Sequence, residues 1–302
     1  MKIVKIHDNS KKIKQEIYPE VIFEETIDYL NELRDEDCNK GTFGTLACVC
    51  GSYGMAGAAM LCGSAALTCG AGIVKMILPQ SIYQIAASNL WECVFVPMKD
   101  SGSGTLSFCD FDKILAEAEK SKAVVIGCGL KVTDDTEKIV VGLLEKCTRP
   151  IILDADGINC LALHIDVLKQ RTARTILTPH PGEMSRLTGM SIAEIHADRI
   201  KAASDFSRKY RCTLVLKGEG TVIAEKDKLC VNPTGNGCLA KGGSGDVLAG
   251  IIGSLVCQGI DSFKAAAAGA YLHGYAADEC IDEYASSCVN ARDIIEAIKY
   301  LM

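Results

Sequence analysis

The sequence predicts an α/β fold of three layers, in which a mainly parallel central sheet is flanked by helices on both faces. Short apolar runs alternate with helical patterns through residues 41 to 256. Several of the runs end in glycine, aspartate or lysine, as strands do at the ligand-binding edge of a parallel sheet. No repeat or linker divides this region. We therefore expect one domain over residues 40–302, and before it a helical arm over residues 1–39 that is a candidate for packing against a neighbouring subunit.

Composition excludes several classes of protein. The chain has 302 residues, of which 48% are hydrophobic and 23% charged, and its net charge of −6 gives no electrostatic basis for binding nucleic acid. The N-terminus lacks the apolar segment of a signal peptide, and no apolar run reaches the length of a membrane span. We expect a cytoplasmic protein with neither a nucleic acid nor a membrane as partner.

Sixteen cysteines are an unusual feature of the chain. They fall singly among apolar residues, without a Cys-x-x-Cys pair and without the spacing of metal ligands. We interpret them as small, reduced core side chains and expect no metal site among them. The alternative is an exposed, reactive thiol.

The first predicted strand, 45–50, runs into a glycine-containing turn at 51–57, which leads to a buried helix at 58–69 and a second strand at 73–78. The turn lacks the Gly-Lys-Ser/Thr ending of a Walker motif, so no lysine is supplied to terminal phosphates. We interpret it as a turn that cradles a substrate.

Four more buried strands are predicted, and each is followed by residues that could bind a ligand or take part in catalysis. They are 123–126 before Gly127-Cys128-Gly129, 150–153 before Asp154, 175–178 before His180, and 213–216 before Lys217. Residues 222–224 and 229–231 form a hairpin-like region. Asp154 fits an inert cap and a group near a ligand equally well, whereas Asp156 is typical of a turn or an N-cap. Lys217, next to glycines, is a natural contact for a phosphate or for the adenine side of a nucleotide.

His180 lies between Pro179 and Pro181, which restrict its backbone to extended conformations. A helix rarely starts across such a sequence, so we expect a rigid loop that displays the histidine, with Glu183 opening the next helix. A histidine there can hydrogen-bond a ligand or exchange protons near neutral pH. A surface histidine is the alternative, and the other four histidines are interpreted as structural or surface residues.

The segment Lys241–Gly250 places glycines directly before a buried helix at 247–256. Backbone amides of Gly242, Gly243, Ser244 and Gly245 then form an anion site at the helix N-terminus. Asp246 is unfavourable beside a bound anion unless it acts as a general base or handles a cation. The alternative is an acidic first-turn residue with no ligand. Helices at 265–278 and 291–300 complete the chain.

Taken together, these segments resemble the ADP/ATP-dependent NAD(P)H-hydrate dehydratases, a branch of the ribokinase-like superfamily. The resemblance spans about residues 40 to 280. The Gly-Gly-Ser-Gly-Asp loop is shared with many sugar and vitamin kinases, whereas the Thr-Pro-His-Pro-Gly-Glu segment and Asn-Pro-Thr-Gly-Asn-Gly are more specific. The matching segments are 40–44, 51–52 with 57–59, 127–130, 154–156, 178–183, 217–218 with 221–223, 232–237 and 242–246.

The resemblance implies a lyase that repairs hydrated NADH or NADPH. It would phosphorylate the ring hydroxyl from ADP, or possibly ATP, with Mg²⁺, and eliminate phosphate. The implied hydrate-binding residues are Ala58, Gly129, His180 and Asp246, with Asp246 catalytic. The implied nucleotide-binding residues are Lys217, Gly218, Glu219, Gly220, Thr221 and Gly245. Ser244 stands where many members have threonine, and Cys128 where proline is common. The family also suggests a homotetramer, and the short N-terminus predicts that the epimerase domain of many members is missing.

Two other functions fit parts of the sequence. A ribokinase-like kinase of a vitamin-precursor alcohol shares the glycine–aspartate loop, but it would not explain His180 in its proline frame opposite Gly57-Ala58-Ala59. A catalytically idle, nucleotide-binding regulatory protein would not need both Asp246 and Lys217.

Overall fold

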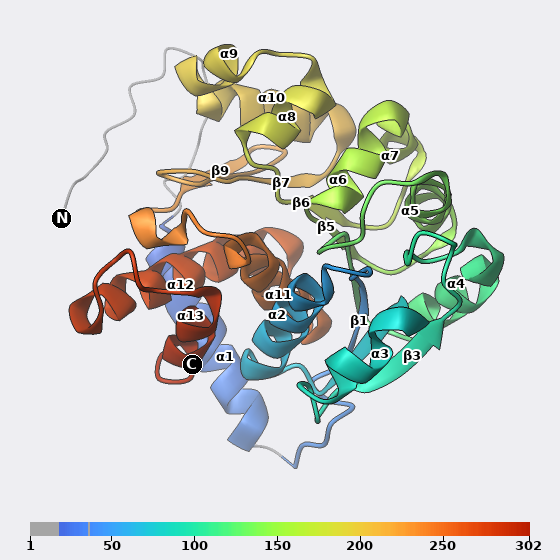
Figure 1. Cartoon of the computed structure of the whole chain (residues 1–302). Coiled ribbons are helices and arrows are strands. Elements are labelled where there is room, and N and C mark those ends of the chain that lie inside the picture. The colour runs from blue at the N-terminus through green and yellow to red at the C-terminus, as the bar shows by residue number, and fades with distance from the viewer. Residues whose placement is uncertain (1–17, 36) are drawn as a thin grey trace.

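A computed structural model describes residues 18–35 and 37–302 of the chain and confirms the predicted architecture (Figure 1). One nine-stranded sheet has the order β3-β2-β1-β4-β5-β6-β7-β8-β9. The pairings from β3 to β7 are parallel, and β8 and β9 join at one edge as an antiparallel hairpin. The first part of the predicted arm, residues 1–17, lies outside the described residues.

The strands form where short, largely apolar segments are predicted, because their side chains are buried on both faces of the sheet. Two strands have the predicted bounds, and the other six predicted strands differ by one residue at one end. The exception is β3, which was not predicted. It contains Pro97 and lies at the edge of the sheet, where a missing backbone N–H leaves no ladder bond broken. The strands are β1 Thr45–Val49, β2 Ile73–Pro79, β3 Val94–Met98, β4 Ala123–Ile126, β5 Ile151–Leu153, β6 Thr175–Leu177, β7 Thr213–Leu216, β8 Val222–Glu225 and β9 Lys228–Val231.

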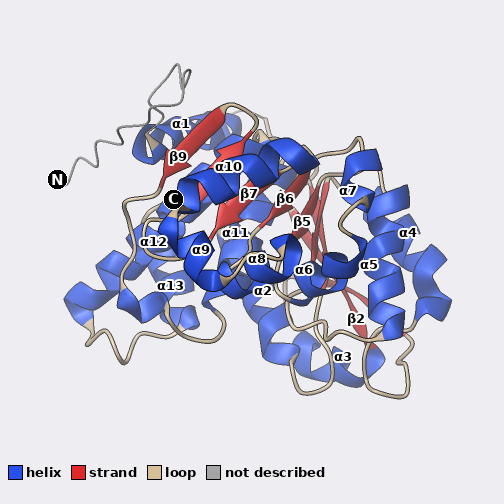
Figure 2. Cartoon of the chain, turned by 90° about the horizontal axis from the view of Figure 1, so that it is seen from above, coloured by secondary structure: helices blue, strands red, loops and turns tan. Residues whose placement is uncertain are grey.

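Helices cover both faces of the sheet and enclose two separate apolar cores (Figure 2). One core contains residues of α1 Pro19–Asp35, α2 Ala56–Thr68, α3 Gln80–Ala87, α11 Ser244–Cys257, α12 Ser262–Glu283 and α13 Ala291–Ile298. The other contains residues of α4 Phe111–Glu119, α5 Asp134–Lys146, α6 Asp156–Leu161, α7 Val167–Gln170, α8 Pro181–Thr188, α9 Ile192–Ala197 and α10 Arg199–Tyr210. This is the three-layer arrangement that the alternation of strands and helices predicts.

Helix α1 belongs to the predicted arm, and it packs along α12 of its own chain. Ile22 and Leu30 of α1 are buried in the first core. The part of the arm that the structure describes is therefore packed on the domain. Among the described residues, no helix is both long and apolar enough to span a membrane.

The glycine-initiated helix α11 lies at the centre of the first core, against α2 and the middle of the sheet. A methyl group on Gly250 would lie 2.3 Å from the carbonyl oxygen of Cys62 in α2. One on Gly253 would lie 2.5 Å from Val125 in β4. These two glycines let the helix approach both neighbours closely, which fixes the position of its N-terminus over the strand ends.

Candidate active site

The carboxyl ends of β1, β4, β5, β6 and β7 carry the residues that the sequence singles out. Because adjacent parallel strands end at the same edge of the sheet, their loops meet there. The N-terminus of α11 faces the same edge, as contacts of Gly245 with groups of the β5 and β7 ends show. The structure therefore brings most of the predicted residues into one site.

Two of the predicted hydrate-binding residues lie in contact. A methyl group on Gly129 would be 2.8 Å from the Cβ atom of Ala58, and Gly129 has φ +65°. The Ser52 hydroxyl donates to the Gly129 carbonyl at 2.7 Å, and the Gly51 amide donates to the Cys128 carbonyl at 2.8 Å. The loops after β1 and β4 thus hold each other in place and form one wall of the site.

A buried ion pair lies next to this wall, and it settles the position of Asp154. The Asp154 side chain is 2% exposed, and its Oδ1 accepts from Lys217 Nζ and from the Thr178 hydroxyl, each at 2.6 Å. Glu183 Oε2 lies 3.9 Å from the same ammonium. Asp154 is therefore inside the site rather than an inert cap, and Lys217 is held between two carboxylates.

These neighbours decide the charge of Lys217. Burial acts to lower the pKa of the ammonium, but Asp154 and Glu183 outweigh it, so the pKa is raised. For Glu183, burial raises the pKa, and the charge of Lys217 opposes that change. The site therefore contains a fixed positive charge at the end of β7.

Replacing Lys217 by Met should destabilise the protein, because it leaves the Asp154 carboxylate buried without its cation. We expect a loss of about 3 kcal/mol in the free energy of unfolding, at the lower end of the range for broken buried pairs, since 20% of the lysine side chain is exposed. Urea denaturation measures this loss. The double variant Lys217→Met/Asp154→Asn should recover part of it, and a double variant less stable than the single one would contradict the role of the pair.

His180 was predicted to lie on a loop ahead of its helix, but it is the N-cap residue of α8. Its Nδ1 accepts from the amides of Gly182 at 2.9 Å and Glu183 at 3.3 Å, while Glu183 Oε2 accepts from the His180 amide at 2.8 Å. The expectation failed because proline is well suited to the first helical position, where its missing N–H needs no partner. The helix therefore begins at Pro181, two residues before Glu183.

This capping arrangement sets the tautomer of His180. Because Nδ1 is an acceptor, the proton of the neutral ring is on Nε2, which lies 3.4 Å from Glu183 Oε1. Burial, followed by the charges of Lys217 and Arg186, lowers the pKa of His180. About half of the side chain remains exposed (51%). His180 therefore presents a neutral imidazole at the rim of the site.

The glycine loop forms the opposite wall and begins α11. Gly243 is the N-cap at φ 98°, and a methyl group on it would lie 2.5 Å from Leu61. One on Gly245 would lie 3.3 Å from Lys217 Nζ and 3.5 Å from Asp154 Oδ2. The helix N-terminus is therefore packed against the ion pair, with only backbone at the point of contact.

Ser244 departs from a simple anion-loop role. It is buried, and its hydroxyl lies 3.3 Å from Nε2 of His273, itself a buried side chain. Burial, assisted by the charge of Lys217, lowers the pKa of His273 to about 4. Ser244 thus contributes its backbone to the loop, and its hydroxyl anchors the loop to α12.

Asp246, in the first turn of α11, is the only acid of this helix. Burial first, and then the charge of Asp154, raise its pKa to about 6, although a hydrogen bond from the Cys128 thiol acts in the opposite direction. Ligand atoms of Cys128, Asp154 and Asp246 lie within 4.8 Å of one another. A carboxylate with a pKa near neutrality at this position can serve as a general base.

The predicted nucleotide-binding turn joins β7 to β8. Gly218 has φ +142° and Gly220 φ +60°, and the Thr221 hydroxyl donates to the Gly218 carbonyl at 3.0 Å. Arg199, which the sequence did not single out, donates to the carbonyl of Leu216 at 2.8 Å and to that of Glu219. This guanidinium fixes the shape of the turn from α10, a role that sequence spacing does not reveal.

Asp156 occupies a different place from that predicted. It is the first residue of α6, whose N-cap is Ala155 at φ 48°. Its carboxylate accepts from the Lys131 amide at 2.8 Å and from the Asn159 side chain at 3.2 Å. The side chain therefore joins the loop after β4 to α6 instead of capping its own helix.

A groove of about 680 Å³ lies between α2 and α13. Gly57 in the first turn of α2 and Gly242 of the glycine loop both line it, and so do Asn290 and Arg292 at the start of α13. The two predicted segments thus border one concave surface next to the site.

Comparison with known proteins identifies consistent relatives. A family model described as NAD(P)H-hydrate dehydratase matches residues 46–300. An ADP-dependent (S)-NAD(P)H-hydrate dehydratase of Neisseria meningitidis is 41% identical over 249 residues, which cover 81% of this chain and 80% of that protein. A bifunctional NAD(P)H-hydrate repair enzyme of Moorella thermoacetica is 38% identical over 270 residues, 89% of this chain but 51% of the relative. The chain thus spans about half the length of the bifunctional relatives it matches.

A solved structure agrees with these relatives. It is that of an ADP/ATP-dependent NAD(P)H-hydrate dehydratase of Bacillus subtilis, co-crystallised with ATP and Mg²⁺. It superposes with a TM-score of 0.76 at 32% identity and covers 89% of this chain and 92% of the other.

Proposed function

The chain belongs to the NAD(P)H-hydrate dehydratase family, and from that premise we propose that it is a nucleotide-dependent lyase that converts hydrated NADH and NADPH back to the intact cofactors. The observation that carries the proposal is the meeting of Asp246 and the glycine loop with the Ala58–Gly129 wall and His180 at one sheet edge. Relatives that carry this name are 34–41% identical to the chain.

Asp246 acts as the base in the first step of the proposed reaction. Its carboxylate takes the proton of the ring hydroxyl, and the hydroxyl oxygen attacks the terminal phosphorus of the nucleotide, whose bond to the bridging oxygen breaks. With ADP the leaving product is AMP. The amides of Gly242 to Gly245 stabilise the charge on the transferring phosphoryl group. Phosphate then leaves with the electrons of the carbon–oxygen bond, and loss of a ring proton restores the double bond.

Lys217 and Asp154 form part of the nucleotide-binding side of the proposed site. The ammonium contributes positive charge next to Gly245, and Asp154 fixes its position. Gly218, Glu219, Gly220 and Thr221 provide the turn for the nucleotide, with Arg199 holding its shape. Ala58, Gly129 and His180 contact the hydrate.

ADP is the proposed phosphoryl donor, with ATP as the alternative, together with Mg²⁺. The residues present fit the ion, because Mg²⁺ prefers oxygen ligands and Asp154 Oδ2, the oxygen that does not accept from Lys217, lies beside Gly245. Asp154 would hold Mg²⁺, which neutralises phosphate charge when bound.

A coupled assay tests the function. Hydrated NADH is supplied with ADP or ATP, and the absorbance of reappearing NADH is followed together with free phosphate. We expect NADH and phosphate in equal amounts. The kinase alternative, which the family assignment disfavours, predicts a stable phosphorylated product with no phosphate release. If neither nucleotide yields NADH, the dehydratase assignment is wrong.

The activity should fall below about pH 6, because the base must be deprotonated and the pKa of Asp246 is raised to about 6. Protonation removes the base, so kcat/KM should drop about tenfold for each pH unit below the inflection. Initial rates measured from about pH 5 to about pH 8 give this pH dependence. Since Asp154 helps to raise this pKa, the residual activity of Asp154→Asn should show its inflection at lower pH. An unchanged inflection would argue against Asp246 as the titrating group.

The proposal also includes the domain bounds, the oligomeric state and the location of the enzyme. Residues 40–302 form the catalytic domain and residues 1–39 its N-terminal arm, and the enzyme acts as a homotetramer in the cytoplasm. Size-exclusion chromatography with light scattering tests the oligomeric state.

A further inference from the structure

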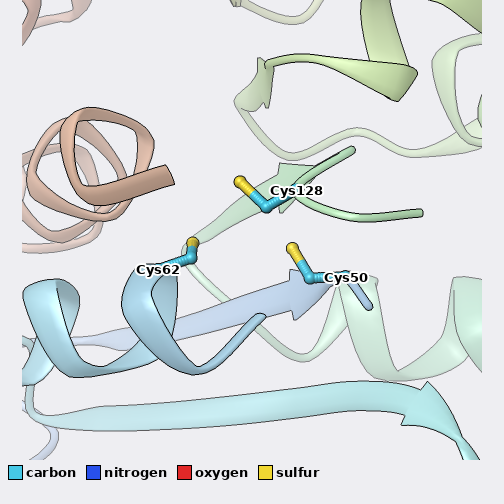
Figure 3. Close-up of side chains that lie close together, drawn as sticks. All are labelled: Cys50, Cys62 and Cys128. Carbon is cyan, nitrogen blue, oxygen red and sulfur yellow. The ribbon is translucent and has the colours of Figure 1, made fainter. Parts of the chain in front are cut away.

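Three cysteines from separate elements lie close together (Figure 3). Cys50 directly follows β1, Cys62 lies in the middle of α2, and Cys128 follows β4. Their Sγ atoms all lie within 4.8 Å of one another, and all three residues are fully buried. The prediction that the cysteines fall singly holds along the sequence, but the fold brings these three together as a cluster.

We propose that Cys50, Cys62 and Cys128 bind one soft divalent cation of the zinc and cadmium class, a property separate from the dehydratase function. Metal–sulfur bonds of about 2.3 Å place the sulfurs around one ion about 3.8–4.0 Å apart. The sulfurs therefore need to shift by less than about 1 Å to ligate it. Thiolate ligands select such ions over Mg²⁺, which prefers oxygen.

The charge balance favours a divalent ion over monovalent copper. Three thiols and a divalent ion form a complex with one net negative charge and release three protons, whereas a monovalent ion leaves two negative charges. Uncompensated charge is costly in a buried site. The divalent ion therefore leaves the smaller net charge in the site, where the Lys217 ammonium is already paired with Asp154.

Release of those protons is required, since the thiols are protonated without a metal. Burial raises the pKa of Cys50, and hydrogen bonds within the cluster raise the pKa of Cys62 and of Cys128. These buried thiols are poor nucleophiles, so direct oxidation is disfavoured. A cation that binds thiolates tightly replaces the protons without any oxidant.

Metal binding at the cluster would affect the catalytic site through Cys128. This residue lies between Gly127 and Gly129, and its sulfur lies within 4.8 Å of a carboxylate oxygen of Asp246. A metal-bound thiolate has no proton to donate, and its negative charge would face the carboxylate. The bound cation should therefore inhibit turnover by changing the surroundings of the base.

Cadmium titration of the full-length chain tests the proposal. The accessible Cys38, Cys109 and Cys288 are first replaced by serine, so that they do not contribute. We expect an ultraviolet sulfur-to-cadmium charge-transfer band that saturates at one ion per chain, with three sulfur ligands by X-ray absorption. Cys62→Ala, in that background, should weaken binding by more than about tenfold.

Cys69→Ala is the matched control, because Cys69 is a buried thiol at the end of the same helix but outside the cluster. It should bind cadmium as its parent does. Cys50→Ala provides a second test if Cys62→Ala does not fold. Equal binding by Cys62→Ala and its parent, or no band in the parent, would overturn the proposal. Because the band is independent of turnover, it also separates this proposal from a failure of the dehydratase assignment.

Discussion

Asp246→Asn should lower kcat by about a thousandfold, within the range by which general bases accelerate reactions, and leave nucleotide binding nearly unchanged. The amide has the shape of the carboxylate but cannot accept the hydroxyl proton. Gly245 and the other loop residues contribute only backbone to the nucleotide side, and the substitution does not alter them. Steady-state rates measure the loss, and calorimetric titration with ADP measures binding.

Asp156→Asn is the control for this experiment. Asp156 is also an acid near the site, but its oxygens accept from the Lys131 amide and the Asn159 side chain. We expect its activity to change by no more than a few-fold. Near-normal activity in Asp246→Asn would exclude Asp246 as the base. Equal losses in both variants would indicate a general electrostatic effect rather than proton transfer.

Gly127→Ala should be the most destabilising small substitution near the site. Gly127 has φ +125°, and a methyl group on it would lie 1.9 Å from the carbonyl oxygen of Asp154 and 2.5 Å from the Gly157 amide nitrogen. Backbone strain of about 1–3 kcal/mol and overpacking of about 1–3 kcal/mol should add. Because the clash is with backbone, β4 and the end of β5 must move apart, and both stability and activity should fall.

Two other glycines separate the two causes. Gly54 also has a positive φ, +87°, but a methyl group there meets nothing within 4 Å, so Gly54→Ala isolates the backbone strain. Gly57 has neither restriction, and Gly57→Ala should be close to neutral. Urea denaturation of the three variants should rank Gly127→Ala as least stable, followed by Gly54→Ala. A Gly127→Ala variant no less stable than Gly54→Ala would mean that the strand ends are not packed as described.

The sequence was sufficient for the fold because its signals are local. Apolar runs that end in glycine or aspartate predicted most of the strands, and the carboxyl-edge rule predicted which of their loops meet. The strand β3 was missed because an edge strand containing Pro97 lacks a strong strand pattern. The start of α8 was misplaced because the prolines around His180 were interpreted only as restrictions on the loop.

Pairings between distant residues were beyond sequence reasoning. Asp154 fitted two roles until Lys217, 63 residues later, was found on its carboxylate. Arg199 gave no signal, because it acts on backbone carbonyls, and any sequence presents those. The cysteine cluster could not be predicted, because its three thiols come from elements that are far apart in the sequence.

The central position of α11 has a consequence for how the molecule folds. Its contacts close very long loops: Ser254 donates to the Cys69 carbonyl, 185 residues away, and the Cys257 thiol to the Phe43 carbonyl, 214 residues away. Such contacts form late, because the entropy of closing the chain must be overcome first. When the parallel strands have already paired, the glycine loop is therefore not yet in its final position. Recovery of nucleotide binding during refolding should thus be slower than recovery of sheet structure, and it should coincide with the docking of this one helix.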